Sequence, residues 1–512
     1  MKNFFLKIKN SEAAIAIIAV VCAVLVIGGI IVAVVAVNVA GNESTESNAE
    51  AQAISIDMNF NTSETESVNS AAQSEVNKAS STLTSSVSNG TAGNTVNKPQ
   101  TEASSATTSN TKRPSVGVKK PAGTMAKVKP NDAKGLAARN KARAQYLSDK
   151  FCFDFYDKYS QRLLIQYPYK NSPNLATAWE YGALQSMQTV ITCMNKTKTQ
   201  LTRLADINTG MEYYGYQKDG KLWGYVVNRG ACELGATEAG LAYDDNMWIA
   251  INFLRSYELT GKKFYLNRAE YIMKFLIDEA WFEPLGGFFW DTRHEARHSC
   301  SNNPTIKIFV DLYKHTGKKT YLTWAQKVYD FSYSTLKDKS RNIYEDLVGA
   351  SFVNGEWVEG SSAGTGFYSY NTGTMISGAA ALYGATKDKK YLDEALSCAE
   401  GAMKYFGDTG VKAGYTNFAC TSNIWFNAIL LRGYMDLYPY AKTQTAKYIE
   451  EFQKSMDYAY ETFDADSKGY MPYNWLQGWD SSDRSYYREA LDMSANAEMY
   501  GMLAIWQKQR SN

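Results

Sequence analysis

Thr260-Gly261-Lys262-Lys263-Phe264-Tyr265-Leu266-Asn267-Arg268-Ala269 is the first of three similar stretches that decide the fold. Residues 316–325 read Thr-Gly-Lys-Lys-Thr-Tyr-Leu-Thr-Trp-Ala, and residues 386–395 read Thr-Lys-Asp-Lys-Lys-Tyr-Leu-Asp-Glu-Ala. Each copy follows an apolar segment with helical periodicity and opens another such segment. The repeated unit is therefore a helix, a short turn and a second helix.

The helices on either side of these turns can be placed from the apolar pattern. The leading helices are predicted at Trp248–Leu259, Ile306–His315 and Met375–Ala385, and the trailing helices begin at the three Tyr-Leu pairs. Stretches rich in Ala, Leu and Met predict further helices at Leu136–Gln161, Ala176–Met194, Leu201–Tyr213, Ile424–Tyr438, Ala446–Thr462 and Met493–Gln507. About twelve helices in antiparallel pairs result.

The spacing of the repeats favours a closed ring over an open superhelix. The units are longer and less even than those of an ordinary helical solenoid, and long excursions rich in Gly, Trp and Asn separate them. We therefore expect an all-α fold over residues 134–512, an (α/α)6 toroid of helical hairpins whose loops gather at one face. The leading helices would form its inner layer.

Polar residues recur just before the leading helices, where they would surround one mouth of the ring. Any one of them could be only a helix N-cap. As a set they indicate a shared cleft, in which the positive ends of the helix dipoles would favour carboxylates. The residues are Asp244, Asp245, Asn302, Asn303, Tyr370, Asn371 and Asn423.

The adjacent pair Asp244 and Asp245 is the strongest candidate for chemistry. Retaining glycosidases use two carboxyl groups about 5–5.5 Å apart, one as nucleophile and one as acid/base, with their pKa values pushed apart. Tyr243 and Trp248 flank the pair, and aromatic rings commonly stack on sugar faces. The alternative is an N-cap with acidic support in the first turn.

Composition is compatible with a carbohydrate substrate, although most aromatic residues of any large domain belong to its core. The chain has 36 Tyr and 11 Trp and a formal net charge of only +2. Nothing in it resembles a nucleic-acid surface or a phosphate-binding loop. The carboxylate mechanism requires no metal and no cofactor.

His294-Glu295-Ala296-Arg297-His298 has the H-E-x-x-H pattern of zinc proteases. That pattern binds zinc when a helix places both histidines on one face and a third ligand follows. Here the flanking segments are predicted to be loops or a short strand, and His315 is expected at the opposite rim. We interpret the motif as a coincidence and expect no metal site.

The N-terminal region predicts a membrane anchor. Ala13–Val37 is an unbroken apolar run, long enough to cross a hydrocarbon core of roughly 30 Å. Lysines precede it and glutamates follow it, which favours a cytoplasmic segment 1–12, a span at 13–37 and the remaining chain outside the cell. A cleaved signal peptide is the alternative, although Asn38-Val39-Ala40 is a poor cleavage site.

Residues 41–133 are predicted to be a disordered linker. The first part is rich in Ser, Thr and Asn and has few aromatic residues, so it cannot bury enough apolar surface to fold. The stretch 112–143 is basic and interrupted by prolines. It could be a solvated linker, or it could bind an anionic cell-wall polymer or lipid head groups.

Several motifs together carry a family resemblance. They are Tyr243-Asp244-Asp245-x-x-Trp248 with Tyr257–Gly261, Gly286-Gly-Phe-Phe-Trp290, Tyr321-Leu-x-Trp324-Ala325, Tyr370-Asn371-x-Gly373 with Ala381-Leu-Tyr383, and Phe426-Asn-Ala-Ile-x-x-Arg432. In order and spacing, residues 240–440 resemble glycoside hydrolase family 76, the endo-α-1,6-mannanase family.

The resemblance implies an (α/α)6 barrel and retaining hydrolysis of α-1,6-mannoside bonds. Asp244 would be the nucleophile and Asp245 the acid/base. The residues expected to bind substrate are Tyr243, Trp248, Phe289, Trp290, Asn303, Tyr370 and Asn371. The chain departs from the family pattern at Phe289, where a second Trp is usual, and at Cys300–Pro304, where an Asn-rich stretch after a Lys is usual.

The sequence thus favours a membrane-tethered, extracellular, monomeric glycoside hydrolase that acts on mannan-like polysaccharide. Three alternatives stay open from the residues. They are transglycosylation between envelope glycans, a non-catalytic glycan-binding module, and unrelated chemistry on an (α/α) ring such as epimerisation.

Overall fold

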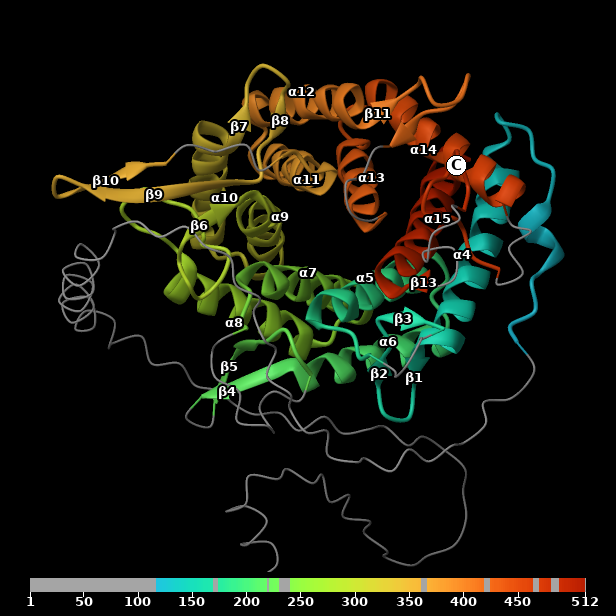
Figure 1. The fold of residues 1–512 in the computed structure, drawn as a ribbon, viewed down its shortest axis with the longest axis horizontal. Coiled ribbons are helices and arrows are strands. Elements are labelled where there is room, and N and C mark those ends of the chain that lie inside the picture. The colour runs from blue at the N-terminus through green and yellow to red at the C-terminus, as the bar shows by residue number, and fades with distance from the viewer. Residues whose placement is uncertain are drawn as a thin grey trace, which may run out of the picture. The chain divides into compact units, whose positions relative to one another are not determined.

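Twelve α-helices make up most of the part of the chain that the structure, a computed structural model, describes (Figure 1). That part consists of residues 117–168, 174–218, 221–229, 240–360, 366–418, 424–463, 469–479 and 488–511. The predicted cytoplasmic segment 1–12, the span 13–37 and most of the linker lie outside it. Among the helices of the described residues, none is long and apolar enough to cross a membrane.

Six of these helices form a closed inner ring. Each contacts the next along the chain, and the last contacts the first. The inner helices are α5 (Ala178–Met194), α7 (Tyr243–Thr260), α9 (Ser299–Thr316), α11 (Ser369–Thr386), α13 (Trp425–Leu437) and α15 (Ala490–Arg510).

The other six helices form an outer layer, each packed on one inner helix. α6 (Lys198–Met211), α8 (Lys263–Ala280), α10 (Lys319–Phe331), α12 (Lys389–Phe406) and α14 (Lys442–Phe463) each follow their inner partner in sequence and contact it. The sixth outer helix, α4 (Ala133–Phe155), contacts α15, so the two ends of the domain pair to close the ring. This is the predicted (α/α)6 toroid.

The three repeated turns share one set of hydrogen bonds. In each, the hydroxyl of the Thr donates to the carbonyl four residues earlier, as Thr260 does to Ser256 and Thr316 does to Leu312. The same Oγ1 accepts the N–H two residues later at 3.2 Å in all three copies. The residue after the Thr is left-handed, with φ of 71° at Gly261 and 62° at Lys387. The pattern therefore ends one helix and aims the chain into the next.

The inner helices α7, α9 and α11 begin five to seven residues earlier than predicted, because the polar residues at their heads belong to the helices. α7 begins at Tyr243, and its N-cap Ala242 provides no side-chain hydrogen bond. α9 runs through Pro304, which lies in a segment predicted to be a loop. α11 includes Gly373, whose missing Cβ would lie 2.7 Å from the Cα of Leu430 on α13. Pro304 and Gly373 therefore lie inside helices, where tertiary packing accommodates them.

Short β hairpins follow most of the outer helices and lead into the inner ones. They pair β1 (Tyr156–Asp157) with β2 (Arg162–Leu163), β4 (Gly215–Lys218) with β5 (Lys221–Tyr225), β7 (Lys337–Asp338) with β8 (Ile343–Tyr344), and β11 (Gly407–Asp408) with β12 (Asn417–Phe418). β3 (Gln166–Tyr167) pairs with β13 (Arg488–Glu489). A three-stranded sheet has the order β10 (Glu356–Glu359), β9 (Leu347–Val353), β6 (Ala296–His298).

Two asparagines at equivalent places fasten the inner helices to these segments. The Asn246 side chain accepts from the N–H of Tyr225 and donates to its carbonyl, both at 2.8 Å. Asn302 makes the same pair of bonds to Phe288, at 2.7 and 3.0 Å. Asn302, predicted at the mouth, is therefore buried and fixes the loop that precedes its helix. Asn423 lies outside the described residues.

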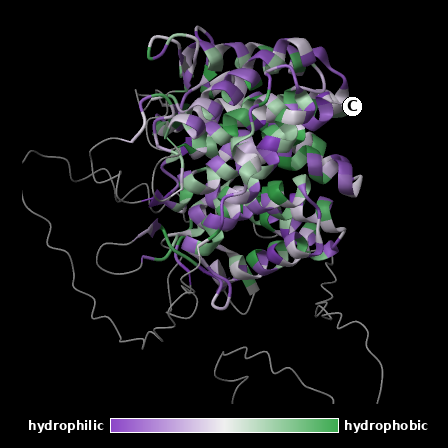
Figure 2. Ribbon diagram, turned by 90° about the vertical axis from the view of Figure 1, so that its right-hand side faces the viewer, coloured by the Kyte–Doolittle hydropathy of each residue, from purple (hydrophilic) through white to green (hydrophobic). Residues whose placement is uncertain are grey.

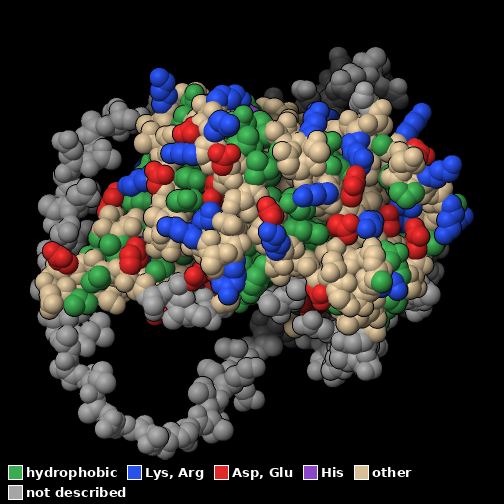
Figure 3. All heavy atoms as spheres, turned by 90° about the horizontal axis from the view of Figure 1, so that it is seen from above, with side chains coloured by type: hydrophobic (Ala, Val, Ile, Leu, Met, Phe, Trp, Pro, Cys, Tyr) green, Lys and Arg blue, Asp and Glu red, His purple; other side chains and the backbone are tan. Residues whose placement is uncertain are grey.

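Burial differs between the two layers as expected for an inner ring wrapped by an outer one. α11 is buried along nearly all of its length, whereas α10 buries only Ala325, Val328, Tyr329 and Phe331. Figure 2 shows hydrophobic and hydrophilic residues alternating along the helices. Figure 3 shows Lys, Arg, Asp and Glu side chains intermingled on the surface. One exposed ion pair joins Lys274 and Asp278 at 2.6 Å.

Part of the stretch 117–132, assigned above to the linker, contacts the domain, although most of its residues are exposed. A 3₁₀ turn, η1 (Ala122–Met125), contacts α4, and its Thr124 carbonyl accepts from Arg143 Nε at 2.8 Å. Arg139 and Arg143, part of the predicted basic stretch, are buried and form ion pairs with Asp457 and Glu461 of α14. These two arginines therefore link the outer helices α4 and α14, at the place where the two ends of the domain meet.

Candidate active site

A cavity of about 890 Å³ opens at the end of the ring where the inner helices begin. First-turn and N-cap residues of α5, α7, α9, α11 and α13 line it, together with the loop 290–293 and Asp346. Because several helix N-termini converge there, backbone N–H groups and helix dipoles create a positive potential in the cavity. The cavity lies at the end of the ring where a cleft was predicted, and Asp244, Asp245 and Tyr370 of the predicted residues line it.

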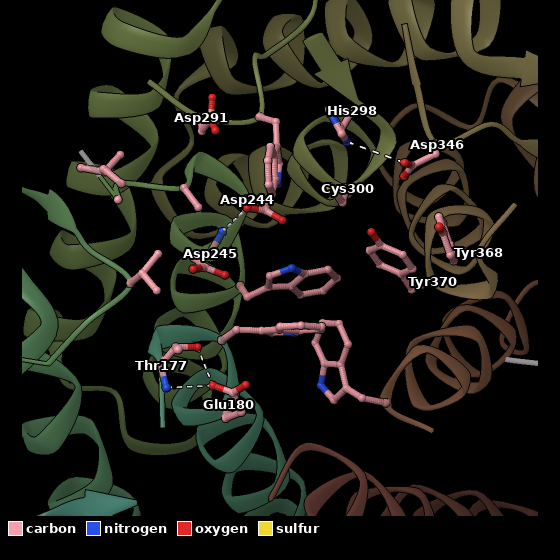
Figure 4. Close-up of a pocket in the computed structure, with 18 of the residues that line it drawn as sticks. Thr177, Glu180, Asp244, Asp245, Asp291, His298, Cys300, Asp346, Tyr368 and Tyr370 are labelled. Carbon is pink, nitrogen blue, oxygen red and sulfur yellow. Dashed lines mark hydrogen bonds and ion pairs between the residues drawn. The ribbon is translucent and has the colours of Figure 1, made fainter. Parts of the chain in front are cut away.

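Asp244 and Asp245 both line this cavity, side by side in the first turn of α7 (Figure 4). The N–H of Asp245 donates to Asp244 Oδ1 at 3.0 Å. The start of the helix is held in place because the N–H of Tyr243 donates to the carbonyl of Trp290 at 2.8 Å and Ala242 bridges to Asp291. The carboxylate pair is therefore fixed on a rigid turn.

The two carboxyl groups have different surroundings. Burial raises the pKa of Asp244 to about 6, and hydrogen bonding by the Trp290 and Cys300 side chains and the Asp245 N–H limits that rise. Burial raises the pKa of Asp245 well above its ordinary value, and the nearby charges of Asp244 and Glu180 raise it further. The pKa of Asp245 is therefore raised more than that of Asp244, which favours Asp245 as the member of the pair that carries a proton.

Aromatic rings form much of the cavity wall. Trp248 meets Trp425 edge to face at a centroid distance of 4.9 Å, and Tyr370 stacks on Phe426 at 4.1 Å. Trp290, next to Asp244, stacks on His298 at 5.1 Å. Such faces suit the apolar patches of sugar rings, while the carboxylates suit their hydroxyls.

A third carboxylate, Asp346, faces the aspartate pair from the other side of the cavity (Figure 4). Its Oδ2 lies 3.9 Å from His298 Nδ1, and its Oδ1 accepts from the Asn371 amide at 3.3 Å. Burial raises the pKa of Asp346 and lowers the pKa of His298 to about 4, so His298 is neutral at neutral pH. Cys300 lies between these groups and Asp244.

Of the residues predicted to bind substrate, Trp248, Trp290 and Tyr370 line the cavity. Tyr243 and Phe289 do not line it. They are buried against His294, to which the Tyr243 hydroxyl is bonded at 3.1 Å and on which Phe289 stacks at 4.7 Å.

Asn303 and Asn371 also lie behind the wall, fully buried between inner helices. Asn303 donates to the carbonyl of Asn371 at 2.9 Å, and Asn371 in turn donates to Asp346. In this structure they hold a cavity residue and do not face the cavity themselves.

The H-E-x-x-H segment does not form a helix. His294 lies in a turn with φ of 55°, and His298 ends β6. In the part of the chain that the structure describes, no group of three or more His, Cys, Asp and Glu side chains could hold a metal ion. His298 nevertheless lines the cavity, which the sequence argument did not anticipate.

Other cavity residues were missed although the same rule could have found them. Trp179 and Glu180 are the second and third residues of α5, as Asp244 and Asp245 are of α7, and Trp425 and Phe426 are the first two residues of α13. Glu180 also forms a capping box with Thr177, accepting its N–H at 2.8 Å. Asp346 had no such signal, because it follows a hairpin.

Comparison with known protein families decides the identity of this arrangement. The profile described as "Glycosyl hydrolase family 76" matches residues 139–509. The chain belongs to glycosyl hydrolase family 76. The match begins within α4 and ends within the last turn of α15, so it includes all twelve helices of the ring.

Curated relatives of this family 76 chain include two fungal proteins named mannan endo-1,6-alpha-mannosidase DCW1. The protein of Candida albicans is 27% identical over 119 residues, which are 23% of this chain and 25% of that protein. The protein of Saccharomyces cerevisiae is 26% identical over 99 residues, 19% and 21% of the two chains. The matched region spans about a quarter of the length of these relatives.

Solved structures show the same fold. A family 76 mannosidase, Bt3792 of Bacteroides thetaiotaomicron, superposes with a TM-score of 0.64 at 26% identity, covering 72% of this chain and 99% of that chain. GH76A of Salegentibacter sp. HEL1_6, an α-1,6-mannanase, superposes with a TM-score of 0.58 at 18% identity, covering 72% and 99%.

Proposed function

We propose that this family 76 chain is a retaining glycoside hydrolase that cleaves α-1,6-mannoside linkages in mannan-like polysaccharide. The observation that carries the proposal is the adjacent Asp244 and Asp245 in one cavity, with surroundings that raise the pKa of Asp245 more than that of Asp244. Retaining hydrolysis needs one carboxylate and one carboxylic acid at the same bond.

In the proposed mechanism, Asp244 attacks the anomeric carbon while Asp245 protonates the departing glycosidic oxygen. The bond to the leaving sugar breaks as the glycosyl ester of Asp244 forms. Asp245, now ionised, takes a proton from a water molecule that attacks the same carbon and releases Asp244. Hydrogen bonding by Trp290 and Cys300 keeps Asp244 available as an anion at the start of the cycle.

The substrate class rests on the relatives. The relatives named above include a mannan endo-1,6-alpha-mannosidase and an α-1,6-mannanase. The structure of the mannanase is that of an inactive variant with two consecutive aspartates replaced, in complex with α-1,6-mannotriose. The aromatic wall of Trp248, Trp290 and Tyr370 supports binding of a neutral glycan of this kind.

The test is to incubate the full-length chain with α-1,6-mannan and to separate the products by chromatography, beside the Asp244→Asn variant. We expect shorter mannooligosaccharides from the wild type only. An added mannoside acceptor would reveal transfer, in which a sugar hydroxyl replaces water. Binding of mannan without any product from the wild type would contradict the proposal and favour a glycan-binding module.

We also propose that the hydrolase acts outside the cell and is tethered through the predicted span 13–37, on the strength of the apolar run and the charges that flank it. Protease added to intact cells should remove the catalytic domain from the membrane fraction. A domain that stays protected, or that is released into the medium without protease, would contradict the tether.

A further inference from the structure

The three-stranded sheet β10-β9-β6 carries a hairpin that projects from the side of the ring (Figure 1). We propose that the aromatic face of this hairpin, Phe352 and Trp357, is a second binding site for the polysaccharide, outside the catalytic cavity. The inference rests on the proposed function, because it assigns the same glycan to a further surface.

The two rings lie on one face of the hairpin. Phe352 on β9 is the direct cross-strand partner of Trp357 on β10, and their centroids are 5.2 Å apart. Side chains of directly paired strand residues point to the same side. Phe352 is 51% exposed and Trp357 36% exposed, both unusual for rings of this size. The hairpin therefore presents aromatic surface to solvent.

Trp357 is held in a defined orientation. Its ring stands perpendicular to Phe282, with centroids 5.0 Å apart and an interplanar angle of 88°. At the base of the hairpin, Arg297 pairs with Glu359 and donates to the carbonyl of Gly349 at 2.9 Å. A braced ring loses little entropy when a ligand stacks on it, which favours a built binding face over an accidental one.

The hairpin is continuous with the wall of the cavity. Asp346 and His298 both line the cavity, and His298 is the partner of Leu347, the first residue of β9. Strand β9 leads from there to Phe352, which at about 3.4 Å per residue lies roughly 17 Å from Leu347. Because side chains alternate along a strand, Phe352 shares its face with Val348 and Arg297 and lies opposite to Leu347 and His298. The aromatic face is therefore separate from the cavity wall, and a long polysaccharide would reach it with a stretch of chain that lies outside the cavity.

Charge on the hairpin selects a neutral ligand. Residues 347–359 contain Glu356 and Glu359 and no Lys or Arg. An anionic polymer or an acidic lipid surface would be repelled, whereas carboxylates beside exposed rings suit a glycan with many hydroxyl groups. Figure 3 shows green and red side chains next to one another at this left-hand end of the molecule.

The test compares Trp357→Ala and Phe352→Ala with the wild-type full-length chain on α-1,6-mannan and on α-1,6-mannotriose, which is too short to reach the hairpin from the cavity. We expect KM for the polymer to rise about three- to tenfold in each variant, as loss of one stacking contact would give. The kinetics on mannotriose should not change. The double variant Val353→Ser, Val358→Ser alters exposed side chains on the opposite face and should behave as the wild type.

Equal losses on polymer and trisaccharide, or no loss on the polymer, would overturn the inference. So would a dimer seen in sedimentation of the wild type and lost in Trp357→Ala, because the face would then belong to a contact between copies. If the wild type cleaves neither substrate, retardation of the same proteins in gels containing α-1,6-mannan still tests the hairpin, so its failure can be told from failure of the proposed function.

Discussion

The N–H of Asp245 donates to the Asp244 carboxylate at 3.0 Å, so the two acids are linked through the backbone as well as through their charges. This hydrogen bond stabilises the anion on Asp244 and so lowers its pKa. The pKa of Asp245 is instead raised by burial and by the charges of Asp244 and Glu180. This difference is the basis for proposing Asp244 as the nucleophile and Asp245 as the acid.

Replacing each acid should therefore have a different signature. Asp244→Asn removes the nucleophile, and kcat should fall at least about 10³-fold on any mannoside. Asp245→Asn removes the acid, and kcat/KM on mannan should fall about 10²- to 10⁴-fold, but much less on an aryl mannoside whose leaving group needs no proton. Steady-state kinetics on both substrates measure this. The reverse pattern would exchange the two roles.

The pH dependence follows from the same pair. Since Asp244 must be ionised and its pKa is raised to about 6, kcat/KM should increase as pH rises through about 6. Since Asp245 must be protonated and its pKa is raised well above the ordinary value, activity should fall again at higher pH. The profile on mannan should be bell-shaped. Full activity at pH 4 would be incompatible with this assignment.

Trp290 should control the acidic limb of that profile. In Trp290→Phe an aromatic ring is kept but the N–H donor is lost, so the pKa of Asp244 should rise and kcat/KM below pH 6 should fall roughly fivefold, for a hydrogen bond worth about 1 kcal/mol. Trp248→Phe is the matched control, because Trp248 lines the cavity but is not among the groups that bond to Asp244. An unchanged limb in Trp290→Phe would remove this role.

The acidic pair should also lower the stability of the fold at neutral pH. Both pKa values are raised on folding, so the folded state binds more protons than the unfolded state between about pH 4 and 6, and stability falls as pH rises through that window. The double variant Asp244→Asn, Asp245→Asn should gain about 1 kcal/mol or more at pH 7, seen as a melting temperature higher by roughly 2–4 °C. At pH 3.5 the gain should disappear.

Close contact between α11 and α13 makes one glycine irreplaceable. A Cβ on Gly433 would lie 2.5 Å from the carbonyl oxygen of Gly373, so Gly433→Ala should lower the free energy of unfolding by about 1–3 kcal/mol. A Cβ on Gly182 of α5 would meet nothing within 4 Å beyond the backbone of its own helix, and Gly182→Ala should be neutral or stabilise by up to about 1 kcal/mol. Urea unfolding of both variants tests the packing of the inner ring.

Much of the ring could be read from the sequence, because the Thr-Gly-Lys-Lys turns and the apolar periodicity are local signals. The helix starts could not, since tertiary packing keeps Pro304 and Gly373 inside helices that propensity alone would end there. The role of Asn302 depends on its bonds to Phe288, which no local pattern reveals.

Part of the candidate site could also be predicted from local sequence. Asp244 and Asp245 could be recognised because adjacent carboxylates at a helix head are unusual, and Trp290 through the resemblance. Asp346 and His298 reach the cavity only because β6 and β9 pair, and that contact joins segments some 50 residues apart (His298 with Leu347). Phe289 and Tyr243, close to the acids in sequence, turn instead toward His294.

The most direct test of the central claim is the anomeric configuration of the first product, followed by proton NMR while the full-length chain hydrolyses α-1,6-mannan beside Asp244→Asn. The account predicts that the α-anomer appears first and only with the wild type, because Asp244 forms a glycosyl ester that water then opens with retention. A β-anomer as the first product, or the same product from Asp244→Asn, would contradict it.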